Sequence, residues 1–233
     1  MTILAVDSSH DTLHLALQGP DFFNSVSFTI GRRYTEELVP LMNEILDRHS
    51  LVWKDLDLLV CTKGPGSFTG LRVAMSTIKG ISLASGVPYV SVSTLQTFAY
   101  PLAYAAYPVL VALDAKKKRY YVALFERGRR LSPDVDLTVE QVCDLITQYK
   151  TIIISGPDGL TLSEKLENMR DSYDLFPDII NDNLQIREYG NSLITLGKAL
   201  YEKEGPDDIS SGPTYIRLSD AELSLLEKNR SKK

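Results

Sequence analysis

With 233 residues, the chain is long enough for one large domain or two small ones around a sizeable apolar core. Its 44% hydrophobic and 24% charged residues are ordinary for a globular protein, and no apolar run approaches the roughly 20 residues that span a bilayer. Two cysteines exclude a disulfide framework and a thiolate metal site, and a net charge of −5 argues against a surface that binds nucleic acid strongly on its own.

The first residues indicate a strand rather than a signal peptide. MTILAVDSS has no basic region and places Asp7 where a signal peptide stays apolar. Residues 3–9 form an apolar run and residues 13–18 alternate, which predicts a hairpin, with a third strand at residues 25–30. From this start and the cysteine count we expect a cytoplasmic protein with no membrane segment.

An amphipathic helix is predicted for residues 36–49. Thr35 is the expected N-cap, and Pro40 is tolerable only near the first turn because it removes a helix donor. Residues 56–62 then form a buried strand. A long helix over residues 71–85, which ends at the C-cap Gly86, follows a glycine-rich loop.

The second half of the chain echoes the first. Residues 109–125 repeat the plan of strand, aspartate, polar turn and returning strand, so that Asp114 falls where Asp7 fell. Residues 151–166 repeat the strand, the Gly-Pro loop and the helix. This pattern predicts a duplicated α/β protein of two lobes, each with a mixed sheet and flanking helices. We assign residues 1–105 to the first lobe, 106–217 to the second and 218–233 to a tail.

The glycine-rich loop departs from both common phosphate loops. Leu71 and Arg72 follow its last glycine, where a P-loop needs lysine and a hydroxyl residue, and its glycines are spaced too widely for a dinucleotide loop. A sharp structural turn and an anion site at the helix N-terminus both stay open. The loop residues are Gly64, Pro65, Gly66, Ser67, Phe68, Thr69 and Gly70.

Aspartates at two strand ends are the candidates for a nucleotide cleft. Asp7 with Ser8, and Asp114 opposite, would face one cleft and hold a metal–nucleotide through oxygen ligands. Alternatively, each aspartate caps its own turn.

The histidines and the candidate nucleophiles do not indicate a metal site or a catalytic group. His10 and His14 are expected roughly 13 Å apart along a hairpin, too far to share an ion, so no metal site is predicted. His49 is expected to interact with a helix dipole, and Cys61 to be a buried, inert thiol. No nucleophile elbow is present, and no catalytic residue is assigned.

Five segments of the chain occur in the order seen in a known family. They are ILAVDSS, YTEELVPLMNEIL, KGPGSFTGLRVAMSTIKGISLASGVPYVSVSTLQTFA, LDAKKKRYYVALF and PTYIR. The chain resembles the TsaB (YeaZ) family strongly over residues 1–125, thinly over residues 126–210 and again at residues 213–217. The resemblance implies the actin-like ATPase (ASKHA) fold, in agreement with the duplicated lobes.

The resemblance also implies an accessory role. TsaB proteins support a TsaD-type transferase, with a TsaE-type ATPase, in threonylcarbamoylation of the tRNA adenosine next to the anticodon. The transferases carry two metal-binding histidines whose positions fall here on Thr94 and Phe98, which cannot replace imidazoles. We therefore expect a non-catalytic scaffold that meets tRNA only indirectly. The alternative is an actin-like ATP-binding enzyme, a kinase or ATPase, that uses Asp7 and Asp114.

A partner surface is implied on the two helices of the first lobe. It would bind the transferase, or a second copy of the chain when alone. No cofactor is expected, except ATP or ADP at a composite interface. The interface residues inferred are Glu37, Leu38, Leu41, Met42, Ile45, Leu71, Ala74, Met75, Ile78 and Ser82. In the open alternative, the core of the lobe consumes both helices.

Overall fold

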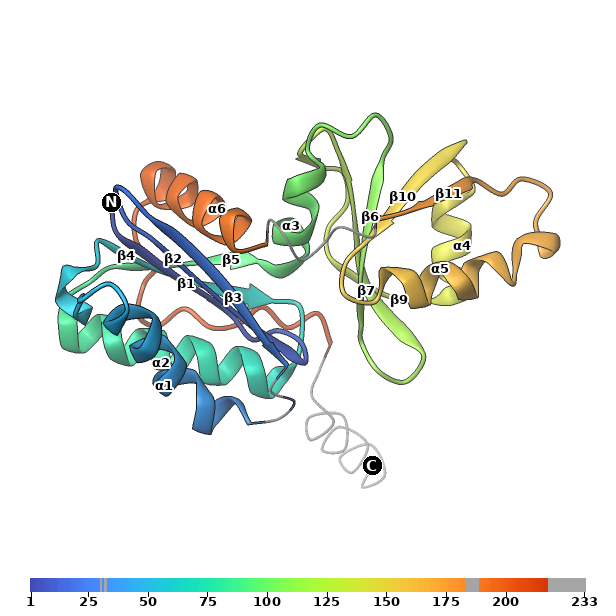
Figure 1. The fold of residues 1–233 in the computed structure, drawn as a ribbon. Coiled ribbons are helices and arrows are strands. Elements are labelled where there is room, and N and C mark those ends of the chain that lie inside the picture. Colours follow the sequence, from blue (N-terminus) through green and yellow to red (C-terminus); the bar gives the residue numbers. More distant parts are fainter. Residues whose placement is uncertain (30, 32, 183–188, 218–233) are drawn as a thin grey trace, which may run out of the picture.

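The computed structural model describes residues 1–29, 31, 33–182 and 189–217, which form two lobes side by side (Figure 1). The first lobe is built on a five-stranded sheet of order β3-β2-β1-β4-β5. Its strands are β1 (Ile3–Asp7), β2 (Thr12–Gln18), β3 (Phe23–Thr29), β4 (Leu58–Gly64) and β5 (Tyr89–Ser93).

The second lobe is built on a six-stranded sheet. Its main path is β11-β10-β6-β7-β8, and β9 pairs with β7. The strands are β6 (Val109–Asp114), β7 (Arg119–Glu126), β8 (Arg129–Arg130), β9 (Val135–Thr138), β10 (Thr151–Ser155) and β11 (Asp178–Asn181).

Both sheets follow one plan, which confirms the predicted duplication. β1 is antiparallel to β2 and parallel to β4, and β6 is likewise antiparallel to β7 and parallel to β10. The outer strands β5 and β11 extend each sheet by a further parallel pair. Each parallel pair needs a crossover connection, which the helices supply.

Helices cover the outer face of each sheet, as Figure 1 shows. In the first lobe these are α1 (Tyr34–Asp47) and α2 (Phe68–Ser85), and in the second α4 (Val139–Ile146) and α5 (Gly159–Glu167). Short 3-10 helices occur at η1 (Trp53–Asp55), η2 (Tyr100–Leu102) and η3 (Arg170–Ser172). No helix within the described ranges is both long and apolar enough to cross a membrane.

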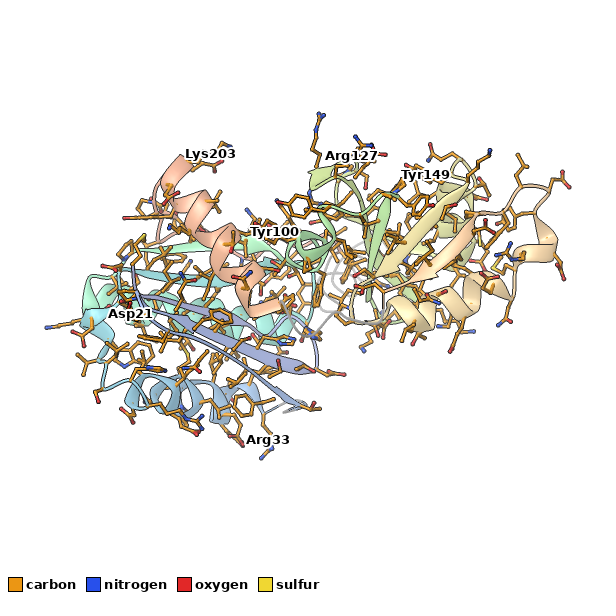
Figure 2. All side chains as sticks on the ribbon, turned by 45° about the horizontal axis from the view of Figure 1, so that its top comes forward. Asp21, Arg33, Tyr100, Arg127, Tyr149 and Lys203 are labelled. Carbon is orange, nitrogen blue, oxygen red and sulfur yellow. The ribbon has the colours of Figure 1, made fainter. Side chains whose placement is uncertain are left out.

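Helix ends agree only partly with the sequence. Gly86 caps α2 in the left-handed conformation with φ of 78°, as predicted. Thr35 is not the N-cap of α1, because the helix already begins at Tyr34 behind Arg33, which makes no side-chain capping bond. Pro40 lies inside α1 rather than near its start. In Figure 2 the Arg33 side chain projects outward at this end of the helix.

Two helices contact strands of both lobes or of the opposite lobe. α3 (Thr94–Ala99) follows β5 and packs on β4 and β5 of its own lobe and on β6 and β7 of the second. α6 (Tyr189–Glu204) follows β11 but packs on all five strands of the first sheet. Gly197 permits this, because a Cβ there would lie 2.4 Å from Val60. The assignment of the whole range 106–217 to the second lobe is therefore wrong for α6.

The chain after α6 forms a strap along the first lobe, residues 205–217. The Asp207 N–H donates to the Tyr89 carbonyl at 2.8 Å, and the Thr214 N–H donates to the Lys63 carbonyl at 2.7 Å. Arg217 then reaches the Ala115 carbonyl of the second lobe at 3.3 Å. The strap thus connects both lobes, and the predicted tail of residues 218–233 lies outside the described residues.

Three apolar clusters hold this arrangement. One lies under α1 and α2, and one under α4 and α5. The third is shared, since it joins the facing sides of both sheets with α3 and α6. The shared core fixes the two lobes against each other and positions the residues at their junction.

Candidate functional site

A cleft of about 1220 Å³ opens between the lobes. The first lobe contributes the turn at residues 9–12 and the loop at residues 66–69, and the second lobe contributes residues 113–117 and Asp158. Arg217 of the strap completes the wall. Of the residues predicted to face one cleft, Asp114 lines it whereas Asp7 and Ser8 do not, and the glycine loop lies opposite Asp114.

The glycines of the loop serve close packing against the turn after β1. A Cβ on Gly66 would lie 2.4 Å from the Ser9 carbonyl oxygen, and a Cβ on Gly70 would lie 1.8 Å from that of Ser8. The Ser67 N–H donates to the Ser9 carbonyl at 2.6 Å, and the Ser8 hydroxyl donates to the Gly70 carbonyl at 2.8 Å. This packing accounts for the glycines as parts of a structural turn.

The start of α2 is joined to the strap. Ser67 is the N-cap, and its side chain accepts the Gly70 N–H at 3.3 Å. The Phe68 ring lies 4.8 Å from the Tyr215 ring, and Arg72 donates to the Tyr215 hydroxyl at 2.7 Å. These contacts hold the loop, the helix and the strap as one unit.

Asp7 is fully buried and does not line the cleft. Its carboxylate accepts hydrogen bonds from the Ser9 N–H at 2.8 Å, the Thr62 hydroxyl at 2.5 Å and the Tyr189 hydroxyl at 2.7 Å. Burial raises the pKa of Asp7, but interactions with His10, His14 and Thr62 outweigh it and hold the pKa well below its usual range. The group is therefore an ionised carboxylate that the chain itself satisfies.

Asp114 has a more open environment, with 35% of its side chain exposed. It accepts the N–H of Lys116 at 2.8 Å and pairs with the Lys116 ammonium at 2.9 Å. Its own N–H donates to Asp158 at 2.7 Å, and burial is the main cause that raises the pKa of Asp158. Asp7 and Asp114 each accept the N–H two residues on, so both cap their turns, as one of the two alternatives held.

The expectation of separated histidines is wrong. The Nε2 atoms of His10 and His14 lie 3.3 Å apart, and Asp7 completes a group whose potential ligand atoms all fall within 4.8 Å. The error came from placing His10 on a strand, because it lies in the turn and folds back over β2. The missed signal was the hairpin register, which sets Asp7 opposite His14.

The surroundings of His14 keep its ring neutral. Burial lowers the pKa of His14 to about 4, with the charge of Asp7 opposing and that of His10 adding to the effect. Its Nδ1 lies 2.6 Å from the Ser27 hydroxyl. His49 lies elsewhere, just past α1, where it stacks on Phe22 with ring centroids 3.9 Å apart.

Of the two positions compared with the transferases, Phe98 lies beside this histidine pair. Thr94 is buried at the start of α3, and its hydroxyl has no hydrogen-bond partner among the described residues. The Phe98 ring packs edge-on against the His10 ring, with centroids 5.6 Å apart, and lies tilted against the Tyr189 ring at 4.2 Å. Phe98 therefore contributes an apolar wall and no ligand atom.

The partner surface inferred from the sequence is largely wrong. Seven of its residues are buried in the core of their own lobe: Leu38, Met42, Ile45, Leu71, Ala74, Met75 and Ile78. Glu37, Leu41 and Ser82 are half-buried. The apolar face of each helix packs on its own sheet, as expected for an amphipathic surface helix.

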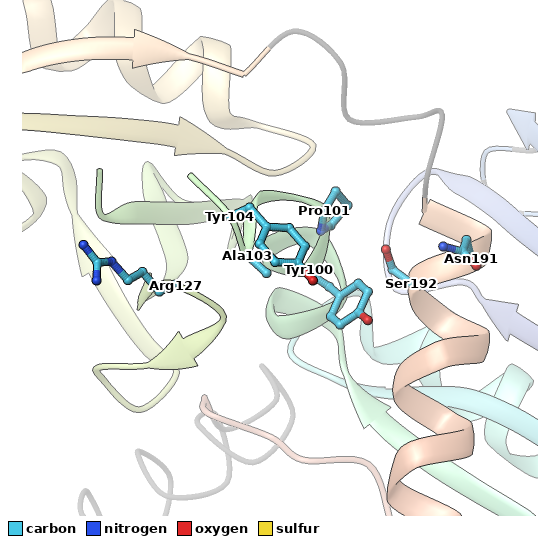
Figure 3. A pocket seen from close by; sticks show the side chains of 7 residues that line it. All are labelled: Tyr100, Pro101, Ala103, Tyr104, Arg127, Asn191 and Ser192. Atoms are coloured by element: carbon cyan, nitrogen blue, oxygen red, sulfur yellow. The ribbon is translucent and has the colours of Figure 1, made fainter. Parts of the chain in front are cut away.

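A second, smaller hollow of about 420 Å³ lies where η2 approaches α6 (Figure 3). Its lining is mainly apolar and aromatic, with Tyr100 and Tyr104 on one side and Asn191 and Ser192 on α6. Arg127 is the charged residue among the lining residues, which include no acid, histidine or cysteine. The hollow therefore offers tyrosine and serine hydroxyls but no carboxylate, imidazole or thiol beside them.

Both cysteines are buried. Burial raises the pKa of Cys61 to about 12, and burial also raises that of Cys143. The prediction that Cys61 is a buried thiol is confirmed, and its high pKa keeps the thiolate scarce at neutral pH.

Solved structures share this two-lobed architecture. YeaZ from Pseudomonas aeruginosa matches with a TM-score of 0.73 at 23% identity, over 92% of this chain and 99% of that one. A Bacteroides thetaiotaomicron protein with an actin-like ATPase fold matches with a TM-score of 0.50 at 12% identity, over 83% and 95%. The chain is thus a two-lobed protein with the actin-like ATPase fold.

Sequence comparisons give the family. The TsaD family model, described as tRNA N6-adenosine threonylcarbamoyltransferase, matches residues 29–201. Two curated relatives are named tRNA threonylcarbamoyladenosine biosynthesis protein TsaB. That of Buchnera aphidicola is 28% identical over 82% of this chain and 79% of its own, and that of Bacillus subtilis is 25% identical over 99% and 100%. The chain belongs to the TsaB (YeaZ) family, within this wider group.

Proposed function

We propose that the chain is a non-catalytic scaffold subunit in the biosynthesis of threonylcarbamoyladenosine on tRNA. It would bind a TsaD-type transferase and act together with a TsaE-type ATPase. Membership of the TsaB family supports the pathway. The observation that carries the scaffold role is an uncharged stripe on the exposed face of α2, which we call the α2 stripe: Ser76, Gly80, Leu83 and Ala84.

The α2 stripe has the character of a docking surface. Leu83 is 71% exposed, and a Cβ on Gly80 would meet no atom of the described residues within 4 Å, so a partner helix can approach closely. The exposed face of a surface helix normally carries charged residues, and that of α1 does, with Glu36, Glu44 and Asp47. On α2 the exposed charged residue is Arg72, which lies one turn before the stripe. The absence of charge on the α2 stripe favours a protein partner.

The candidate acids support a role without catalysis. Asp7 is enclosed by hydrogen bonds within the chain, and Asp114 is paired with Lys116. The net charge of −5 favours contact with tRNA through the partner rather than directly. When the transferase is absent, we propose that the α2 stripe pairs with a second copy of the chain.

Reconstitution tests the scaffold role. The purified chain alone should transfer no threonylcarbamoyl group to tRNA, whereas addition of TsaD-type and TsaE-type partners should restore turnover. Robust transfer by the chain alone would contradict the proposal.

A matched pair of variants tests the surface. Leu83→Asp should weaken binding to the transferase roughly 10- to 100-fold, because burial of a leucine contributes about 1.5–3 kcal/mol. Leu175→Asp is the control, since Leu175 is 75% exposed but belongs to the second lobe. Binding is measured by calorimetry and self-association by light scattering. Equal affinity of both variants would exclude the α2 stripe.

The rival proposal, an actin-like ATP-binding enzyme, has weaker support. Asp7 does not line the cleft, so only Asp114 of the two acids is placed to meet a metal–nucleotide. Calorimetry with Mg-ATP distinguishes the two proposals. Micromolar binding that Asp114→Ala abolishes would favour the enzyme, whereas no binding by the chain alone agrees with the scaffold.

A further inference from the structure

Three polar side chains stand in one row across the first sheet. Asp7 on β1 is the register partner of His14 on β2, and His14 is the register partner of Ser27 on β3. Directly opposed residues of antiparallel strands place their side chains on the same face of the sheet. The row therefore rests on rigid elements, and its geometry does not depend on a loop.

His10 lies over this row from the turn between β1 and β2. The Tyr34 hydroxyl donates to its backbone carbonyl at 2.5 Å and fixes the turn. Its Nε2 faces the Nε2 of His14 at 3.3 Å. Its Nδ1 faces the other way, 3.6 Å from the Asp7 carboxylate and 3.5 Å from the Ser9 hydroxyl.

The proton positions of the pair are restricted. The Asp7 carboxylate lies 3.6 Å from Nδ1 of His10, so a proton on that nitrogen faces its negative charge, which leaves a lone pair on Nε2 of the neutral ring. His14 can place its proton on Nε2 and donate to His10. It can also place the proton on Nδ1 and donate to Ser27, so that two lone pairs meet 3.3 Å apart. The second state needs a cation between the rings.

We propose that His10 and His14 bind one divalent first-row transition-metal ion through their Nε2 atoms. Two imidazole nitrogens on a tetrahedral zinc ion, each about 2.0–2.1 Å from the metal, lie about 3.4 Å apart. The separation in this structure is 3.3 Å, so the spacing of the two nitrogens already matches that of two ligands on one ion. Only the His14 proton changes place, from Nε2 to Nδ1.

The groups behind the two rings are those of a built metal site. A metal-bound histidine generally donates its other N–H to a carboxylate, a carbonyl or another oxygen acceptor. The Ser27 hydroxyl, 2.6 Å from Nδ1, supplies this acceptor for His14, and the Asp7 carboxylate lies 3.6 Å from Nδ1 of His10, just beyond hydrogen-bond length. The buried negative charge of Asp7 also compensates the charge of the ion.

The remaining coordination positions face the interlobe cleft. His10 and His14 both line that cleft, and 14% of the His10 side chain is exposed. The rings of Phe98 and Tyr189 close the apolar side. Water or an oxyanion entering the cleft would complete the coordination. Imidazole ligands favour zinc, cobalt, nickel or iron over magnesium, which prefers oxygen.

Zinc titration of the untagged, chelator-stripped chain tests the site. We expect one zinc ion per chain by calorimetry and by elemental analysis after dialysis. His10→Ala and His14→Ala should each weaken binding more than roughly 100-fold, beyond the effect typical of an outer-shell partner. His49→Ala is the matched control, because His49 lies apart from the pair, and it should bind as the parent chain does.

Two further measurements test the site even if a histidine variant fails to fold. Ser27→Ala should weaken zinc binding on the order of 10-fold. Cobalt added to the parent chain should give a visible absorption spectrum of nitrogen coordination that His10→Ala abolishes, and excess Mg²⁺ should not displace it. No saturable one-to-one binding by the parent chain, or unchanged binding by both histidine variants, would overturn the proposal. These readouts do not involve tRNA, so the scaffold proposal stands or falls separately.

Discussion

The same turn occurs in both lobes, but its aspartate has a different environment in each. In each, a central strand ends in an aspartate that accepts the N–H two residues on, at Asp7 and at Asp114. Asp7 is buried because α6 crosses from the second lobe and brings the Tyr189 hydroxyl onto its carboxylate. Asp114 has no such cover and pairs with Lys116 at the cleft.

The loops that face these turns show the same contrast. Gly64 and Gly156 end equivalent strands with φ of 111° and 100°. In the first lobe the loop continues with backbone packed on Ser8 and Ser9, whereas in the second the side chain of Asp158 accepts the Asp114 N–H. The same backbone path therefore carries a buried hydrogen-bond network at Asp7 in the first lobe and a more exposed, charged one at Asp114 in the second.

The largest predicted effect comes from replacing each of the two aspartates with alanine. Asp7→Ala leaves the Ser9 N–H and the hydroxyls of Thr62 and Tyr189 without their acceptor. Each buried unsatisfied donor costs about 1–3 kcal/mol, so we expect the three together to lower the free energy of unfolding by at least about 3 kcal/mol. Asp114→Ala should lose only about 0–1 kcal/mol, because its ion pair is exposed.

Urea denaturation followed by circular dichroism measures both variants. The contrast between the lobes fails if the two variants lose similar stability. A large loss at Asp114 alone would mean that the basic turn, rather than the buried network, holds the junction together.

A smaller effect is expected from the loop glycines. Gly70→Ala places a methyl group on the Ser8 carbonyl and should destabilise the chain by about 1–3 kcal/mol, as overpacking does. Gly80→Ala lies in the same helix in open space and should stabilise it by roughly 0.5–1 kcal/mol, because alanine favours helices. Thermal unfolding of the pair checks both signs, and destabilisation by both would contradict this packing account of the loop.

Local patterns in the sequence predicted the backbone path well. The alternation at residues 13–18 and the apolar runs at residues 3–9 and 109–114 describe single strands, and their pairing follows from short turns. The repeated strand, Gly-Pro loop and helix identified the duplication because both copies keep the same order. These features depend on neighbours in the chain.

Features that depend on distant segments could not be predicted. No local signal states that α6 returns to the first sheet, so the burial of Asp7 by Tyr189 was invisible. The apolar residues of α1 and α2 indicated a buried face but left open whether a partner or the core of their own lobe covers it, and the second alternative is the one found. The distance from His10 to His14 depends on how the turn folds back, which residue spacing alone does not fix.

The smallest predicted effect concerns the basic turn of the second lobe. Lys116, Lys117 and Lys118 all adopt the left-handed conformation, with φ of 60°, 55° and 61°. Because this region costs an L-residue roughly 1–2 kcal/mol and glycine loses more entropy on folding, Lys118→Gly should stabilise the chain by about 0.5–1 kcal/mol. The same change at Lys198, inside α6, should destabilise the chain by about 1 kcal/mol.

We expect the melting temperatures of the two variants to move in opposite directions by about 1–4 °C. If Lys118→Gly destabilises the chain, the lysine side chain holds the turn through contacts that outweigh its backbone strain, and the second lobe would be as closely tied at this turn as the first.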